Sequence, residues 1–159
     1  MSVNSRLTRY LVGRKYWQPA LLIWLMFCSL GHAEQANDNG SRVVNGVFTS
    51  QIADRRPVDQ VLILTNDVDT IYFYTDLHRF QGQTITHRWE YEGNVISEKK
   101  FDVAGPSWRV YSVKKLKPNM TGKWSVVVTD NNGWPVYVAI FEYVSQNSGS
   151  KSVILPPPE

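Results

Sequence analysis

The sequence predicts an all-β fold, an immunoglobulin-like antiparallel β-sandwich of about seven strands, preceded by a signal peptide. Two observations in the body of the chain predict the sandwich. Apolar residues alternate with a period of two, and the alternating segments are rich in β-branched and aromatic residues. Turn-forming residues interrupt these segments at short intervals, which is typical of antiparallel β-domains. The third observation is a basic N-terminus followed by a short apolar run.

Several segments carry the alternating pattern. We expect strands over residues 43–50, 71–77, 84–91, 95–103, 108–113, 122–129 and 135–143. Trp89 and Trp124 lie mid-strand at alternating apolar positions, so both are predicted core residues. The stretch 51–70 is less regular, and its apolar residues 61–64 fit either a short extra strand or a helical turn.

Side-chain matching predicts how segments 84–91 and 95–103 pair as a hairpin. A three-residue loop at Glu92-Gly93-Asn94, with Asn94 in the left-handed conformation, matches apolar with apolar residues and opposite charges with each other. The predicted pairs are Tyr91 with Val95, Ile85 with Phe101, and Arg88 with Glu98. A two-residue loop gives a poorer match, because it sets Thr84 against Phe101 and Glu90 against Val95.

Residues 1–33 have the pattern of a secretory signal peptide. The segment contains four basic residues and no acidic one, an apolar run over 20–28, and small residues, Gly31 and Ala33, before a cleavage after Ala33. The apolar run is well short of the roughly 20 residues that a membrane-spanning helix needs. We therefore expect the protein in the periplasm or secreted, without stable membrane insertion after cleavage. The alternative is an inner-membrane anchor formed by an uncleaved leader.

The rest of the chain divides into a flexible lead-in over 34–41, the β-sandwich over 42–145 and a disordered Pro-rich tail over 146–159. Four of the 17 basic residues lie in the leader, so the mature chain has 13 against 14 acidic residues. Nothing in this balance favours nucleic-acid binding, which needs a basic face. Cys28 is the only cysteine, so the mature chain has neither disulfides nor thiol chemistry.

A series of motifs runs through the second half of the chain. In order, they are His87-Arg88-Trp89-Glu90-Tyr91-Glu92-Gly93, Phe101 to Ser112, Leu116-Lys117-Pro118, Thr121 to Val126, Asp130-Asn131-Asn132-Gly133 and Phe141-Glu142-Tyr143. The series resembles an uncharacterised bacterial family of exported all-β domains of unknown function, family 2914, over roughly residues 42–143. The resemblance implies an envelope or secreted protein, and it brings no catalytic or ligand-binding residue with it.

Candidate catalytic and metal-binding residues are few. The mature chain has two histidines, His78 and His87, and their spacing does not match a known metal motif even with Asp76. His87 shares a strand face with Ile85 and Trp89, which favours a hydrogen-bonded core or edge histidine. There is no Gly-x-Ser-x-Gly elbow, and Asp67 with Asp69 supplies too few carboxylates for calcium. We expect no metal, no cofactor and no catalytic residue.

A docking surface follows from the alternation of strand directions. Loops 78–83, 104–107 and 130–134 are expected at one end of the sandwich, where aromatic and arginine side chains form a candidate contact surface. Its predicted residues are His78, Arg79, Phe80, Trp108, Arg109 and Trp134. Loops 51–70, 92–94 and 114–121 are expected at the opposite end, with Arg55, Arg56, Lys114, Lys115 and Lys117.

The resulting functional hypothesis is a non-catalytic binding or assembly module of the bacterial cell envelope. Its partner is a glycan, a peptidoglycan fragment or an envelope protein. One alternative is a hydrolase-type enzyme that uses His87 or His78 as its base. A second is a purely structural accessory domain that docks through the Pro-rich tail. The sequence gives no indication of the oligomeric state.

The leader generates a first prediction. Signal peptidase should cleave after Ala33, because small residues occupy both positions that the enzyme recognises, and Glu34 should be the mature N-terminus. Intact-mass measurement on protein purified from its native compartment checks the cleavage. A mass that includes residues 1–33 would support the membrane-anchored alternative instead.

Overall fold

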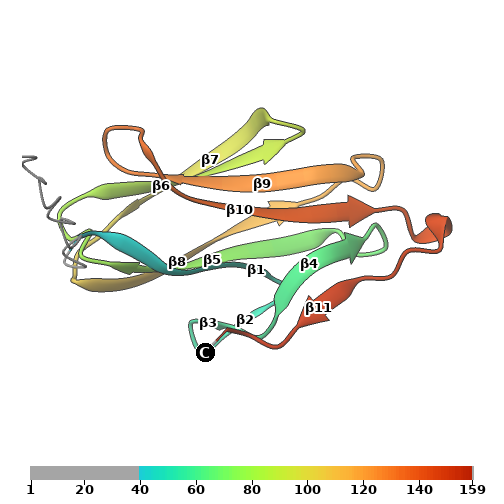
Figure 1. Ribbon diagram of the computed structural model, residues 1–159, viewed down its shortest axis with the longest axis horizontal. Coiled ribbons are helices and arrows are strands. Elements are labelled where there is room, and N and C mark those ends of the chain that lie inside the picture. Colours follow the sequence, from blue (N-terminus) through green and yellow to red (C-terminus); the bar gives the residue numbers. More distant parts are fainter. Residues whose placement is uncertain (1–39, 159) are drawn as a thin grey trace, which may run out of the picture. The chain divides into compact units, whose positions relative to one another are not determined.

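The structure, a computed structural model, describes residues 40–158 of the chain (Figure 1). This part is all-β, and its only helical element is a short 3-10 turn over Gln146–Ser148. The strands are β1 (Arg42–Thr49), β2 (Ile52–Ala53), β3 (Arg56–Pro57), β4 (Gln60–Thr65), β5 (Thr70–His78), β6 (Thr84–Tyr91), β7 (Asn94–Asp102), β8 (Ser107–Lys115), β9 (Gly122–Thr129), β10 (Pro135–Val144) and β11 (Val153–Leu155). The predicted leader and its cleavage site lie outside the described residues.

Two main sheets form opposite layers of the domain (Figure 1). The smaller sheet has the strand order β1-β5-β8, and the larger has the order β11-β4-β10-β9-β6-β7. Neighbouring strands are antiparallel except β4 and β10, which pair in parallel. The third sheet is the short β2–β3 hairpin. No helix within residues 40–158 is long and apolar enough to cross a bilayer.

Aromatic side chains from both sheets meet in the core. Phe48 on β1 lies 4.7 Å from Phe141 on β10 and 5.7 Å from Trp89 on β6, measured between ring centroids. Trp89 and Trp124 are both almost fully buried, which confirms the sequence prediction for these two residues. The rings adopt tilted and edge-on arrangements that aromatic pairs prefer, so ring packing joins the two layers.

All of the predicted strands are present, with ends that agree to within two residues. Residues 61–64 belong to strand β4, so the helical alternative for them was wrong. Three short strands, β2, β3 and β11, were not predicted. The tail, expected to be disordered, instead pairs β11 with the free edge of β4, because its apolar residues Val153, Ile154 and Leu155 supply a short β-forming run.

The β6–β7 hairpin has the predicted register away from its turn, but the turn differs, and the predicted pairing of Tyr91 with Val95 was wrong because Val95 pairs with Glu90. Ile85 pairs with Phe101 and Arg88 with Glu98, as expected. The turn itself is a two-residue loop in which Glu92 and Gly93 both have positive φ, and Tyr91 faces Asn94. A β-bulge between Trp89 and Glu90 absorbs the resulting one-residue shift and restores the predicted pairs beyond it.

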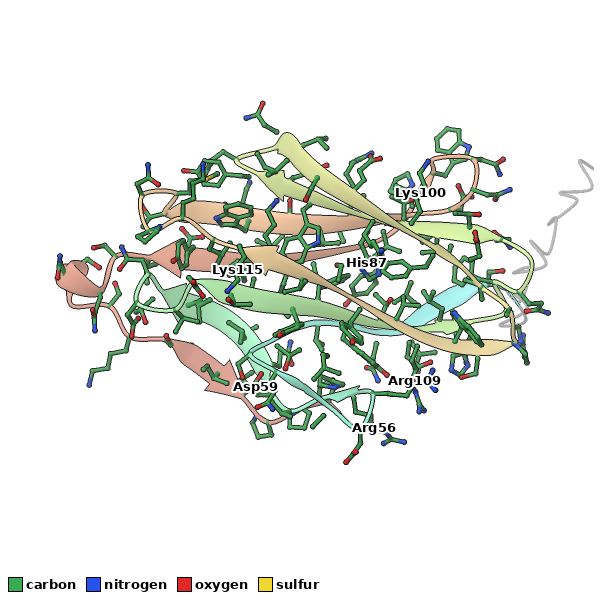
Figure 2. All side chains as sticks on the ribbon, turned by 180° about the vertical axis from the view of Figure 1, so that it is seen from behind. Arg56, Asp59, His87, Lys100, Arg109 and Lys115 are labelled. Atoms are coloured by element: carbon green, nitrogen blue, oxygen red, sulfur yellow. The ribbon has the colours of Figure 1, made fainter. Side chains whose placement is uncertain are left out.

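His87 is a fully buried polar residue that joins the two layers (Figure 2). From β6 its Nε2 lies 3.0 Å from the Thr75 hydroxyl on β5, and its Nδ1 lies 3.0 Å from the Ser112 hydroxyl on β8. The Ser112 oxygen also accepts a hydrogen bond from Trp89 Nε1 at 3.0 Å. The prediction of a hydrogen-bonded core histidine is confirmed, and each ring nitrogen has a partner in the opposite sheet.

Burial lowers the pKa of His87 to about 3, because a charged imidazolium would lose its hydration without gaining a carboxylate. In the unfolded chain the histidine pKa is about 6.5. Between these two values the unfolded chain binds a proton that the folded chain does not. Acid therefore favours unfolding across this window.

The free energy of unfolding should consequently fall as the pH is lowered from about 6.5 towards 3, with His87 contributing up to about 1.4 kcal/mol per pH unit. Urea unfolding at a series of pH values measures this slope. His87→Gln should be less stable at pH 7 and should flatten the slope. His78→Gln, at the partly exposed histidine, is the matched control and should have the same slope as the wild type. Equal slopes in wild type and His87→Gln would show that His87 does not cause the pH dependence.

Candidate binding site

Strand pairing brings the three predicted loops to one end of the domain. His78 at the end of β5 pairs with Ser107 at the start of β8, and Thr86 on β6 pairs with Thr129 at the end of β9. Backbone hydrogen bonds tie two of the loops together, including one of 2.7 Å from Arg79 N to Pro106 O. The alternation of strand directions assumed from the sequence is therefore present.

The six predicted docking residues do not form one surface. Phe80 is only 2 % exposed and belongs to the core, because Arg79 takes a positive φ of 63° and the loop turns the next residue inward. Trp108 is half-buried against the core cluster, whereas Trp134 is 71 % exposed at the β9–β10 loop. His78 and Arg109 lie elsewhere, on the outer face of the smaller sheet.

The outer face of the smaller sheet carries a row of polar and aromatic side chains. Paired residues on neighbouring strands share a face, and the pairs here are Asp76 with Arg109, Tyr74 with Tyr111, and His78 with Ser107. Asn45 on β1 pairs with Asp76 from the other side, next to a β-bulge at Val44. Three strands thus position one continuous polar row centred on Asp76.

Two segments outside the sheet turn this row into a pocket of about 390 Å³. The β2–β3 hairpin contributes Arg56 and Pro57, and the tail contributes Pro157 and Pro158. Figure 2 shows Arg56 and Arg109 on the same side of the domain, and both line the pocket with Asp76. The prediction that Arg56 lies at the opposite end was wrong, because the β2–β3 hairpin brings it to the pocket lined by His78 and Ser107.

Asp76 has an unusual hydrogen-bonding state. Its side chain is 11 % exposed, and its Oδ2 accepts a hydrogen bond of 3.2 Å from Arg109 Nε. Its Oδ1 is buried and has no hydrogen-bond partner among the described residues, although His78 Nε2 lies 3.3 Å away. Buried carboxylate oxygens are nearly always hydrogen-bonded in folded proteins. The carboxylate therefore lines the pocket with Oδ2 bonded to Arg109 and with Oδ1 enclosed beside His78.

Two groups beside Asp76, the Arg109 guanidinium and the Tyr74 phenol, have raised pKa values. The hydrogen bond from Arg109 to Asp76 raises the pKa of the guanidinium, which stays a cation. Burial, followed by the negative charge of Asp76, raises the pKa of the Tyr74 phenol, which stays protonated and able to donate. The pocket thus offers two arginine cations, one phenol donor and one carboxylate acceptor.

The same cluster contains a serine, a histidine and an aspartate without the geometry of a catalytic triad. Ser107 Oγ lies 3.5 Å from His78 Nε2, and Asp76 Oδ1 lies 3.3 Å from that same nitrogen. A triad instead places the serine and the carboxylate on different ring nitrogens. Within residues 40–158, no group of three or more His, Cys, Asp or Glu side chains is arranged to hold a metal ion.

Asp76 and Tyr74 line this pocket but were not among the predicted docking residues, whereas His78 and Arg109 were. Tyr72, Tyr74, Asp76 and His78 follow one another at every second position of a predicted strand, so they share a face. That period-two row of polar and aromatic residues could have predicted a shared polar face. The contributions of Arg56 and the tail prolines could not be predicted from the sequence pattern, because they depend on chain reversals far away in the sequence.

The segment of the chain that matches a known family contains only some of the pocket residues. Residues 82–143 match the family model "Protein of unknown function (DUF2914)", which spans β6 to β9 and almost all of β10. The match is narrower than the range 42–143 expected from the motifs. It includes Ser107 and Arg109, whereas Asp76 and Tyr74 precede it. No curated protein matches the chain.

The placement of the predicted docking residues generates a stability prediction. Phe80→Ala should lower the free energy of unfolding by about 3–5 kcal/mol, the usual cost of removing a buried phenyl ring. Trp134→Ala should change it by less than about 0.5 kcal/mol, because the indole is mostly exposed. Urea unfolding of both variants at pH 7 measures the difference, and similar losses in the two would contradict the placements.

Proposed function

We propose that this protein is a non-catalytic binding module of the bacterial cell envelope that holds an acidic glycan in the Asp76 pocket. The observation that carries the proposal is the Asp76 carboxylate, which lines one pocket together with Arg56 and Arg109. A site with this composition gains most from a ligand that has both hydroxyl donors and a negative charge.

The ligand chemistry follows from the groups present. A sugar hydroxyl can donate to the Asp76 carboxylate at the pocket wall, and hydrogen bonds to charged groups are among the stronger ones in proteins. A carboxylate on the sugar can pair with Arg56 or Arg109, whose planar guanidinium groups suit it. The pocket volume suits one or two sugar units.

The arrangement of strands supports an immunoglobulin-like sandwich as the scaffold of this module. The larger sheet contains consecutive antiparallel strands β10-β9-β6-β7, and the smaller contains β1-β5-β8. Trp89 lies on β6, between β9 and β7, and packs against Phe48 and Phe73 of the opposite sheet. Antibody domains place a tryptophan in the corresponding inter-sheet position against a disulfide, whose place aromatic packing takes here.

The proposed location in the periplasm or outside the cell rests on the predicted leader. A glycan of the envelope is the acidic ligand that such a location offers. Two sources supply the required chemistry, namely peptidoglycan fragments, with their lactyl and peptide carboxylates, and acidic polysaccharides built from uronic acids. The shared feature is a carboxylate on a sugar, and the experiment below separates the two sources.

The alternatives make less use of the pocket. His87 is enclosed between the sheets, so the hydrolase-type alternative relies on His78, whose Nε2 faces both Ser107 and Asp76. An accessory domain that docks through its tail would need the tail prolines free, whereas Pro157 and Pro158 line the pocket. An envelope protein as the partner would bind the same face without requiring a sugar.

Isothermal titration of the purified protein with three probes tests the proposal. The probes are a muropeptide, an oligogalacturonate and a neutral chitooligosaccharide. One or both acidic probes should bind at least ten times more tightly than the neutral one, because only they engage the arginines. Which acidic probe binds identifies the source of the ligand. Equal affinities, no binding, or turnover of a probe would each contradict the proposal.

Asp76→Asn should weaken binding of the acidic probe by at least tenfold, about 1.4 kcal/mol or more, because it removes the charged acceptor and its pairing with Arg109. Its melting temperature should be measured alongside to show that the variant is folded. Trp134→Ala and the double change of Lys114 and Lys115 to Ala are controls that should keep the affinity. Loss of binding in Trp134→Ala alone would place the site on the loops instead.

A further inference from the structure

The two sheets leave an open edge between β7 and β8. Strand β8 ends the smaller sheet and β7 ends the larger one, so each has an edge without a neighbouring strand among residues 40–158. The opposite edge of the larger sheet, by contrast, is lengthened by the tail strand β11 on β4. An edge of nine residues such as β8 carries a row of backbone donors and acceptors that another strand can use.

A groove of about 340 Å³ runs between these two edge strands. Trp89 and Ser112 are its buried floor, Tyr111 and Val113 line the β8 side, and Ser97 and Lys99 line the β7 side. Tyr111 and Val113 are each about half exposed, so apolar side chains border an unpaired backbone edge. This is the arrangement into which an extended peptide can add as a strand while placing alternate side chains in a groove.

Lys99 and Glu98 both line the groove, and a second lysine lies at its border. Lys114 points across it from β8, and its Nζ donates to the Ser97 hydroxyl on β7 at 2.9 Å. Burial lowers the pKa of Lys114, and no carboxylate within 4.0 Å pairs with it in the described part of the chain. Arg109 and Lys115 on β8 already pair with Asp76 and Asp69, so Lys114 is the β8 cation without a carboxylate partner among the described residues.

The charges beside the β8 edge indicate which kind of strand can bind there. A second copy of β8 would add a second Lys114 and no acidic residue to balance either lysine, because β8 contains none. An acidic strand instead gives Lys114 a counterion while its backbone pairs with the β8 edge. We propose that the β8 edge is a second binding surface, independent of the Asp76 pocket, that accepts an extended acidic segment of a partner protein by β-strand addition.

A peptide-binding experiment tests this surface. The probes are two nine-residue peptides, one alternating valine with glutamate and one alternating valine with lysine. The glutamate peptide should bind at least ten times more tightly, and it should slow amide hydrogen exchange in residues 107–115. Equal binding of the two peptides, no binding at millimolar concentration, or protection on another strand would overturn the proposal.

Backbone methylation distinguishes strand addition from simple charge attraction. In one glutamate peptide, N-methyl groups block the amides of odd-numbered residues, and in a second they block those of even-numbered residues. Only one of the two should lose binding, by at least tenfold, because alternate amides of an added strand face β8. Equal affinities of the two methylated peptides would show that the backbone edge is not used.

Matched charge variants complete the test. Lys114→Glu should weaken the glutamate peptide at least tenfold and improve binding of the lysine peptide, whereas Lys117→Glu, at an exposed lysine in the following loop, should change neither by more than about twofold. Asp76→Asn should also leave peptide binding unchanged, so failure of the glycan proposal does not affect this one. A dimer of the unliganded protein in sedimentation that is lost in Lys114→Glu would identify a second copy as the occupant and overturn the proposal.

Discussion

The hydrogen bonds of His87 fix how the two sheets sit on each other. A buried imidazole must satisfy both nitrogens, and here its two partners are hydroxyls from different strands of the opposite sheet. A slide of one sheet over the other would break at least one of these bonds within the apolar core. Aromatic packing contributes most of the attraction between the two sheets, but it tolerates small shifts of one sheet over the other. The hydrogen bonds of His87 fix the relative position of the sheets.

This constraint reaches the outer surface through the alternation of side chains along a strand. Thr75, which holds His87 from inside, lies between Tyr74 and Asp76, which point outward into the pocket. Ser112 likewise lies between Tyr111 and Val113 at the open edge. The residues that lock the layers are therefore direct neighbours of the residues that form both proposed binding surfaces. A rigid inner row holds the outer row at a defined spacing, as a preformed ligand site requires.

Sequence patterns predicted what is local and missed what depends on distant chain reversals. Period-two alternation located the long strands, and charge and size matching found the pairing of Arg88 with Glu98 because cross-strand neighbours interact directly. The turn at Glu92 and Gly93 was missed because a glutamate rarely takes a positive φ. The short strands of the hairpin and the tail have too few residues to show a period. No local pattern therefore indicated that Arg56 lies at the pocket. The row from Tyr72 to His78 was visible in the period-two alternation, but it was not interpreted as one face of a strand.

The tail strand has a consequence for how the domain responds to mechanical force. β11 is held to β4 over only three residues, and the chain beyond it runs on through Pro157 and Pro158 at the pocket. A force applied to this end would break the β11–β4 hydrogen bonds one after another, while the aromatic core between the two sheets bears no force. The first event under tension is then the removal of the proline wall from the Asp76 pocket, with the two-layer scaffold intact. Tension along the chain would in this way change access to the pocket without unfolding the domain.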